Sequence, residues 1–359
     1  MDSDSAAAAR GHRRAMLRTA LGCGAALLAG NLLAGALGLR WETPGTRPQL
    51  QKLAAFRRGA GSGRRVDVVF LGSSHTKTAV VPELLEAELE QALGRPFEVW
   101  NLAVAAAVAP MAEALQLELF AGPLQAPRVL VIEADPLFWN EARDDHGTEQ
   151  YWRWFAPAKA IATAVAAQPW TALQAAARRA GWGLEALWQQ PLYALDARLS
   201  RMRVQYQRGH GSRWNRTKAA RGAAQDDEEW REVSDPAEAA ALLETRRQLV
   251  RPLRTLQEWR PLLGRIAARA QAGGAEVVLL NQPVTETFMA LYEPGAYAAH
   301  LAALESAAAE FGIRLVDLNV AAFRDPGEFA NLDHLSAAAA PASARRLALE
   351  VLLPSPQVR

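Results

Sequence analysis

The sequence has a single cysteine, Cys23, among its 359 residues. One cysteine excludes an internal disulfide framework and any zinc site built from several cysteines. The H-E-x-x-H zinc motif and the spacing of an EF-hand are also missing. A glycine-rich phosphate loop should follow a strand, whereas Gly61-Ser62-Gly63 precedes the first apolar run. We therefore expect no metal and no nucleotide cofactor.

Neither sign of charge predominates, since 40 Lys and Arg residues accompany 38 Asp and Glu residues. The resulting net charge of +2 predicts no particular partner. Half of the residues are hydrophobic, which indicates a folded core and argues against extensive disorder. A chain of this length suits one large domain or two modest ones.

An uncharged run, Thr19–Leu39, lies near the N-terminus between several arginines and Arg40. Its length suits a helix that crosses a bilayer. We expect residues 1–40 to form a cytoplasmic tail and a single membrane anchor in the inner membrane, with the main domain outside the cytoplasm. Two alternatives stay open: a signal peptide cleaved near Ala34-Gly35-Ala36, which would give a secreted protein, and a buried core helix.

Residues 41–65, with two prolines and the ending G-S-G-R-R, predict a linker or short helix outside the core. From residue 66 to residue 353, short apolar runs alternate with helical patterns. The expected strands are 66–72, 97–104, 128–134, 275–283 and 313–319, and the expected helices are 82–94, 112–120, 262–274, 298–311 and 337–353. This alternation predicts an α/β fold, a three-layer α/β/α domain with a mainly parallel five-stranded sheet.

The segment from about residue 140 to 261 breaks this alternation and predicts a helical insertion beside the sheet. It is rich in tryptophan and contains an arginine-rich stretch followed by D-D-E-E. Packing is the first interpretation of its aromatic residues. The functional alternative is a lid or a surface for an anionic glycan or lipid head groups.

The stretch V-V-F-L-G-S-S-H-T, Val68–Thr76, ends an expected strand and places Ser74 at the edge where parallel sheets bind ligands. A serine nucleophile needs a base. Among the histidines, His334 follows the fifth strand and belongs at the same edge, whereas His75 adjoins Ser74 and is not expected to point back towards it. The alternatives are that Ser74 is a helix cap and that His334 serves packing or capping.

Three stretches resemble the conserved blocks of the SGNH (GDSL-like) hydrolases, a family with an early serine and a late histidine. They are G-S-S at Gly72–Ser74, N-L-A-V at Asn101–Val104 and N-L-D-H-L-S at Asn331–Ser336. The resemblance implies an SGNH/flavodoxin-like fold with Ser74 as nucleophile and His334 as base. It also implies an oxyanion hole built from Ser74, Asn101 and Ala105.

The sequence departs from the family pattern at the acidic partner of the histidine. Asn331 stands where the family has aspartate, and Asp333 directly precedes His334. An amide oxygen can orient an imidazole but supplies no charge, and the aspartate-to-asparagine change in the serine-protease triad costs about 10⁴ in turnover. Three alternatives follow: Asn331 orients His334, Asp333 substitutes, or the pair works as a dyad. The third family block, with its oxyanion asparagine, has no clear counterpart.

The membrane-tethered arrangement resembles the DltD-like and alginate-acetylation groups of this family. It implies an extracytoplasmic serine esterase or O-acyltransferase that acts on acyl groups of an exported polysaccharide or envelope polymer. A membrane protein that supplies acyl groups is a further expected partner, and nucleic acid is not expected. The alternatives are a catalytically degenerate family member that binds glycans or assists assembly, and a membrane-anchored scaffold.

Overall fold

The computed structural model describes residues 52–53, 55–56, 65–105, 107–120, 125–143 and 236–359. The chain divides into two units, and every described residue belongs to the one formed by Gly45–Tyr151 and Arg208–Arg359. The predicted anchor, Thr19–Leu39, and most of the predicted tryptophan-rich insertion lie outside the described residues. Within the described part, no helix combines the length and the hydropathy that crossing a membrane requires.

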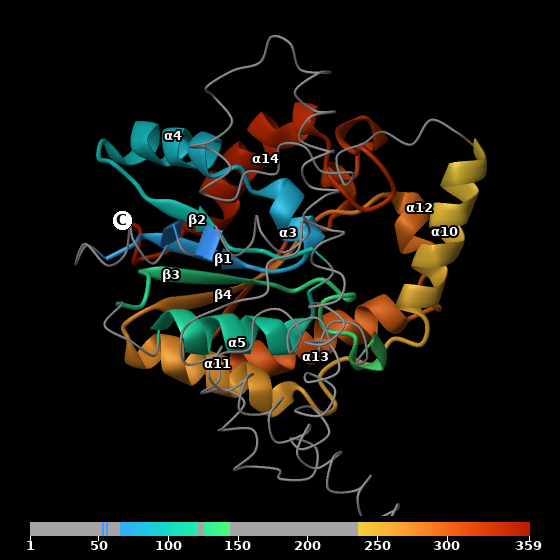
Figure 1. Cartoon of the computed structure of the whole chain (residues 1–359), viewed down its shortest axis with the longest axis horizontal. Coiled ribbons are helices and arrows are strands. Elements are labelled where there is room, and N and C mark those ends of the chain that lie inside the picture. The colour runs from blue at the N-terminus through green and yellow to red at the C-terminus, as the bar shows by residue number, and fades with distance from the viewer. Residues whose placement is uncertain (1–51, 54, 57–64, 106, 121–124, 144–235) are drawn as a thin grey trace, which may run out of the picture. The chain divides into compact units, whose positions relative to one another are not determined.

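A five-stranded sheet forms the centre of this unit (Figure 1), and all its strand pairs are parallel. The strand order is β2-β1-β3-β4-β5. The strands are β1 (Val68–Leu71), β2 (Val99–Asn101), β3 (Val129–Glu133), β4 (Glu276–Asn281) and β5 (Arg314–Asp317). The α/β fold with five parallel strands is confirmed, although each strand is shorter than its apolar run.

The helices flank the sheet, with α4 and α14 on one side and α5, α11 and α13 on the other (Figure 1). Their bounds, with those of the shorter helices, are α3 (Ser74–Ala79), α4 (Pro82–Leu93), α5 (Ala109–Phe120), α10 (Pro236–Val250), α11 (Arg260–Ala272), α12 (Glu286–Met289), α13 (Ala296–Phe311) and α14 (Ala340–Arg346). Parallel strands covered on both faces have no polar face, so they appear as continuous apolar runs. The burial of every residue of β1, β2 and β3 agrees with this.

Alternate strand residues meet α4 and α14 in one hydrophobic core. Val68 and Phe70 of β1 point into it, because residues two apart along a strand share a face. The other members include Val129, Val131, Val278 and Leu280 from the strands, Leu85 and Leu89 from α4, and Ala344, Leu347, Val351 and Leu352 from the C-terminal helical segment.

Two expectations about the ends of the domain need correction. Part of the expected linker packs on the domain, since Leu53 and Phe56 are buried and the Phe56 ring lies 5.2 Å from that of Trp100, edge to face. The expected final helix is three pieces: a 3-10 turn (Ala337–Ala339), α14, and a π-helical segment (Leu347–Leu352). In both places tertiary packing decides the conformation, and the sequence pattern does not carry that information.

The strand order places a topological switch point at the carboxyl edge of the sheet. From β1 the chain crosses to β2 on one side, and β3 then lies on the other side of β1. The loops that follow β1 and β3 therefore diverge, and doubly wound sheets bind ligands at such a switch point. Ser74 follows β1, and Glu133 and Asp135 lie at the end of β3, so all three border this point.

Candidate active site

The turn after β1 presents two serines with different surroundings. Ser73 is buried and caps α3: its hydroxyl accepts a hydrogen bond from the His75 backbone N–H at 3.3 Å and donates one to Glu133 Oε1 at 2.5 Å. Ser74, the first residue of α3, is half-buried. The hydroxyl of Ser73 is thus committed to the turn, whereas that of Ser74 has no hydrogen bond within the described part of the chain.

The carboxylate of Glu133, at the end of β3, holds this turn in place. Its Oε2 accepts hydrogen bonds from the Ser73 N–H at 2.7 Å, the Thr76 N–H at 3.1 Å and the Thr76 hydroxyl at 2.6 Å. The first N–H groups of a helix have no partner within the helix, and a negative charge there is favourable. Glu133 thereby ties the start of α3 to the central strand.

Gly72 makes this close approach feasible. A Cβ atom on Gly72 would lie 2.4 Å from Thr76 Oγ1 and 2.5 Å from Glu133 Oε2. Both distances are shorter than van der Waals contact, so any larger residue would push the carboxylate away from the turn. The glycine of the G-S-S stretch is therefore required by packing against Glu133.

Asn101 fixes the other end of α3. Its Nδ2 donates to the backbone oxygens of Thr76 at 3.1 Å, Lys77 at 3.3 Å and Val80 at 2.8 Å, and its Oδ1 accepts from the Ala103 N–H at 3.1 Å. An amide group has only two N–H bonds, and these contacts use them. We therefore assign Asn101 to positioning the helix that carries Ser74 and do not retain it as an oxyanion donor.

His334 is oriented by Asn331. Asn331 Oδ1 accepts hydrogen bonds from the backbone N–H groups of Asp333 at 3.2 Å and His334 at 3.1 Å. These two donors identify this atom of the side-chain amide as the oxygen. The same oxygen lies 2.9 Å from His334 Nδ1. Because an amide oxygen only accepts, Nδ1 carries the proton, and the neutral ring keeps its lone pair on Nε2.

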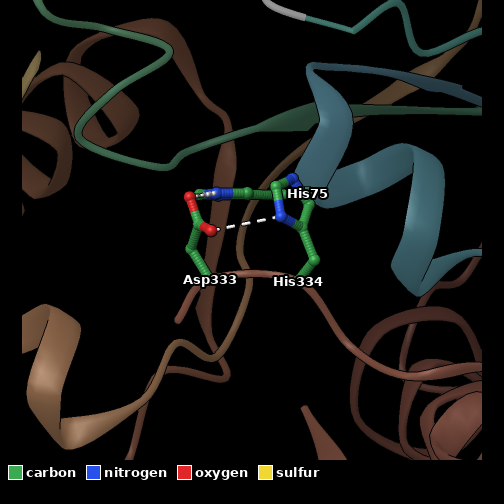
Figure 2. Close-up of side chains that lie close together, drawn as sticks. All are labelled: His75, Asp333 and His334. Atoms are coloured by element: carbon green, nitrogen blue, oxygen red, sulfur yellow. Dashed lines mark hydrogen bonds and ion pairs between the residues drawn. The ribbon is translucent and has the colours of Figure 1, made fainter. Parts of the chain in front are cut away.

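Asp333 supplies the charge that Asn331 lacks. Figure 2 shows its carboxylate between two imidazole rings, with Oδ1 3.1 Å from His334 Nδ1 and Oδ2 3.1 Å from His75 Nε2. Arg246 of α10 approaches the same carboxylate, with Nε 2.6 Å from Oδ2 and Nη2 3.2 Å from Oδ1. Burial would raise the pKa of Asp333, but His334, His75 and Arg246 together hold this pKa well below its usual value. Asp333 is ionised.

His75 lies between two buried carboxylates. Its Nδ1 is 3.2 Å from Asp135 Oδ2, and its Nε2 faces Asp333. Burial alone would lower the pKa of His75, but Asp135 and Asp333 raise this pKa well above its ordinary value. Nε2 is hydrogen-bonded and Nδ1 is in ion-pair contact, so His75 is unsuited to accept a proton from Ser74.

Two groups of side chains have the residue types of a metal site: His75 with Asp333 and His334, and His75 with Glu133 and Asp135. Their surroundings favour ion pairs instead. Arg246 occupies the Asp333 carboxylate, and the shared His75 ring faces a carboxylate on each side. Both Glu133 oxygens already accept hydrogen bonds. A cation would have to displace these donors, so we assign no metal to either group.

The structure brings Ser74 and His334 to the same edge of the sheet without a hydrogen bond between them. His334 Nε2 is buried and has no hydrogen-bond partner among the described residues. In enzymes without substrate, the hydrogen bond between a nucleophile and its base is often long and shortens only when the substrate binds. Ala105 lies in the turn after β2, and within the described part neither its backbone N–H nor that of Ser74 has an acceptor.

Four residues of this network were missed from the sequence: His75, Glu133, Asp135 and Arg246. The stretch E-A-D directly after the buried run V-L-V-I offered a signal for two of them, because carboxylates at the end of a central strand face the ligand edge. Arg246 had no such signal, since it comes from a helix within the predicted insertion.

Comparison with protein-family models gives no match to the chain, and comparison with curated proteins gives none either. The resemblance to the SGNH hydrolases therefore rests on the three short stretches.

Proposed function

We propose that this protein is an SGNH-type serine esterase or O-acyltransferase with Ser74 as nucleophile and His334 as general base. The observation that carries the proposal is the state of His334. Its Nδ1 is held by Asn331 and Asp333, and its buried Nε2 has no hydrogen-bond partner among the described residues at the edge of the sheet where Ser74 begins α3. A histidine that acts as general base for a serine needs this tautomer, with the proton on Nδ1 and the lone pair on Nε2.

In the proposed reaction, Ser74 Oγ attacks the carbonyl carbon of an acyl ester while His334 Nε2 takes the hydroxyl proton. The tetrahedral intermediate then collapses as the imidazolium gives this proton to the leaving alcohol. Water or a second alcohol next attacks the acyl-serine, with the same histidine as base. Esterase and transferase differ only in that last acceptor.

Positive charge on His334 develops during the attack, and Asp333 is the group that compensates it. Its Oδ1 lies 3.1 Å from Nδ1, so the asparagine at position 331 does not leave the ring without an anionic neighbour. Asn331 sets the ring orientation and Asp333 contributes the charge. This division replaces the single aspartate of the family pattern.

The proposed oxyanion hole consists of the backbone N–H groups of Ser74 and Ala105. Both lack an acceptor within the described part, and both lie in turns at the carboxyl edge of neighbouring strands. Removing one donor of an oxyanion hole typically costs about 10²–10³ in turnover. Backbone donors of this kind would compensate for the missing asparagine of the third block.

The resemblance extends the proposal to substrate and location. We propose a three-layer SGNH-like domain outside the cytoplasm, anchored in the inner membrane by Thr19–Leu39, that acts on acyl groups of an exported polysaccharide or envelope polymer. A membrane protein would supply the acyl groups for transfer. A secreted form after signal cleavage is the alternative.

A second candidate is a degenerate SGNH-fold protein that binds glycans or assists assembly. It is favoured because no hydrogen bond joins Ser74 to His334 among the described residues, and because the Asn101 amide is used in bonds to α3. The two candidates differ in whether Ser74 is reactive.

A fluorophosphonate probe tests this reactivity on the purified full-length protein. The proposal expects covalent labelling of the intact protein and none of Ser74→Ala. Ser306→Ala, which removes a hydroxyl from α13, is the matched control and should label normally. If the intact protein stays unlabelled while a known SGNH hydrolase reacts under the same conditions, the degenerate candidate replaces the enzyme.

Replacing His334 with alanine should slow labelling of Ser74 at least about 10²-fold, since a positioned general base contributes about 10²–10⁴. His300→Gln serves as the control, because His300 bonds to Ala134 O and Thr255 rather than to the proposed site. An unchanged rate in His334→Ala would remove this histidine from the mechanism.

A further inference from the structure

We propose that His75 is a permanently charged imidazolium that positions Asp333 against His334. It is a positioning residue that acts through Asp333, and its importance for catalysis rests on the proposed function above. The inference about its charge and its effect on His334 stands on the geometry of the buried groups.

The ion pairs of the His75 ring favour two protons. Nε2 is hydrogen-bonded to Asp333 Oδ2 at 3.1 Å, and Nδ1 lies 3.2 Å from Asp135 Oδ2, an ion-pair contact that is not a hydrogen bond. A neutral imidazole has one N–H and no charge, so it would leave two buried carboxylates without a positive charge between them. An imidazolium supplies that charge to both carboxylates.

Charges of alternating sign follow one another through the buried part of the site. Asp135 is followed by His75 and then by Asp333, where Arg246 adds a second positive charge, and the neutral His334 ring lies next to Asp333. The titratable groups on the elements around the His75 ring are Glu133 and Asp135 from β3 and its loop, Asp333 and His334 from the C-terminal loop, Arg246 from α10, Arg143 from the turn Glu141–Arg143, Tyr292 after α12, and His300 from α13.

Without the charge on His75, Asp135 and Asp333 would be two buried carboxylates that repel each other. Arg246, which pairs with Asp333, would then be left to offset this repulsion. Buried charges without a partner are costly, and one of the two would take up a proton or move. A proton or a shift at Asp333 would remove the anion beside His334 Nδ1. His75 thus keeps Asp333 ionised and in place.

His75 also acts on His334 directly. The two rings lie edge to face with centroids 5.1 Å apart, and His75 is 3 % exposed. A positive charge at this distance opposes protonation of His334.

Nitrogen NMR of the imidazole side chains tests the inference on the full-length protein labelled with [¹⁵N]histidine. We expect both nitrogens of His75 to stay protonated from about pH 5 to about pH 8, and neutral His334 to carry its proton on Nδ1. Neutral His75 at about pH 7, with a protonated Asp135 in its place, would overturn the inference. This measurement needs no variant, so a folding defect cannot obscure it.

Two variants test the coupling. His75→Gln should raise the pKa of Asp333, which His75 lowers, and adding Asp135→Asn should bring this pKa back towards the original value because that pair removes one charge of each sign. His300→Gln is the control and should leave the pKa of Asp333 unchanged, since the pKa of His300 is lowered to about 4 and the ring is neutral. A merely structural role for His75 predicts no such restoration, and its absence would contradict the inference.

Fluorophosphonate labelling separates this inference from the proposed function. An unlabelled intact protein refutes the serine chemistry, whereas the NMR result alone decides the state of His75. If the serine is reactive, labelling should slow in His75→Gln and recover in part in the double variant. Equal rates in all three proteins would overturn the positioning role.

Discussion

Replacing Glu133 with alanine removes the acceptor of four hydrogen bonds at the turn that carries Ser74. The hydroxyls of Ser73 and Thr76 can rotate towards other acceptors, but their backbone N–H groups cannot. Each buried donor left without a partner costs about 1–3 kcal/mol, so the two N–H groups together predict a loss of about 2–6 kcal/mol. This is a large part of the roughly 5–15 kcal/mol that stabilises a typical domain.

Glu133→Gln provides the informative comparison. The amide oxygen can take the place of Oε2, which accepts three of the four hydrogen bonds. The remaining contact involves the Ser73 hydroxyl, which can accept from the amide as well as donate. We therefore expect a loss of only about 0.5–1.5 kcal/mol, the net value of one hydrogen bond.

The assay is urea unfolding of the full-length variants, followed by hydrogen exchange of the Ser73 and Thr76 amides. Glu305→Ala removes an exposed glutamate from α13 and serves as the control. Exchange at both amides should accelerate in Glu133→Ala and remain slow in Glu133→Gln. Equal unfolding midpoints for Glu133→Ala and the control, or equal losses for alanine and glutamine, would refute this account of the turn.

Three further predictions concern other parts of the structure. Gly72→Ala should reduce both stability and Ser74 labelling, because its Cβ would lie 2.5 Å from Glu133 Oε2; normal labelling would contradict the packing role. Arg246→Ala should raise the pKa of Asp333, because Arg246 lowers this pKa in the intact protein. It should also reduce the unfolding midpoint more than Arg247→Ala does, which is a matched change at an exposed ion pair on the same helix. Burial lowers the pKa of His300 from 6.5 to about 4. The neutral ring therefore contributes to the free energy of unfolding above pH 6.5, and this contribution is lost as the pH falls towards about 4. By linkage this loss amounts to roughly 3 kcal/mol, and a pH series of urea unfolding should show His300→Gln with a flatter profile.

The sequence indicated the strands well because a parallel sheet covered on both faces needs continuous apolar runs. V-V-F-L, V-L-V-I-E and E-V-V-L-L-N all form strands at the expected places. The ends were less accurate: Phe97–Val104 contains a strand of only three residues, Val99–Asn101, although the N–H groups of Leu102 and Val104 still bond to the backbone oxygens of Phe70 and Gly72. Leu53 and Phe56 were expected outside the core, yet both are buried, and the Phe56 ring packs edge to face against Trp100.

At the candidate site, sequence reasoning weighed the histidines by their distance along the chain from Ser74. His75 was set aside because adjacent side chains rarely point at each other. The structure agrees with that geometry, but the ring points instead at Asp135 and Asp333, which arrive from the loop after β3 and from the C-terminal loop. Contacts across 60 to 258 residues have no local signature.

The amino-acid sequence alone determined the α/β class and the edge of the sheet at which Ser74 and His334 lie, because apolar periodicity and the order of strands and helices are local properties of a chain. The tertiary structure decided the roles of the polar groups. Only packing shows that Ser73 is a cap, that Asn101 holds α3, and that Asp333 places a carboxylate beside the His334 ring, since burial and partner distance fix protonation and neither is encoded by spacing.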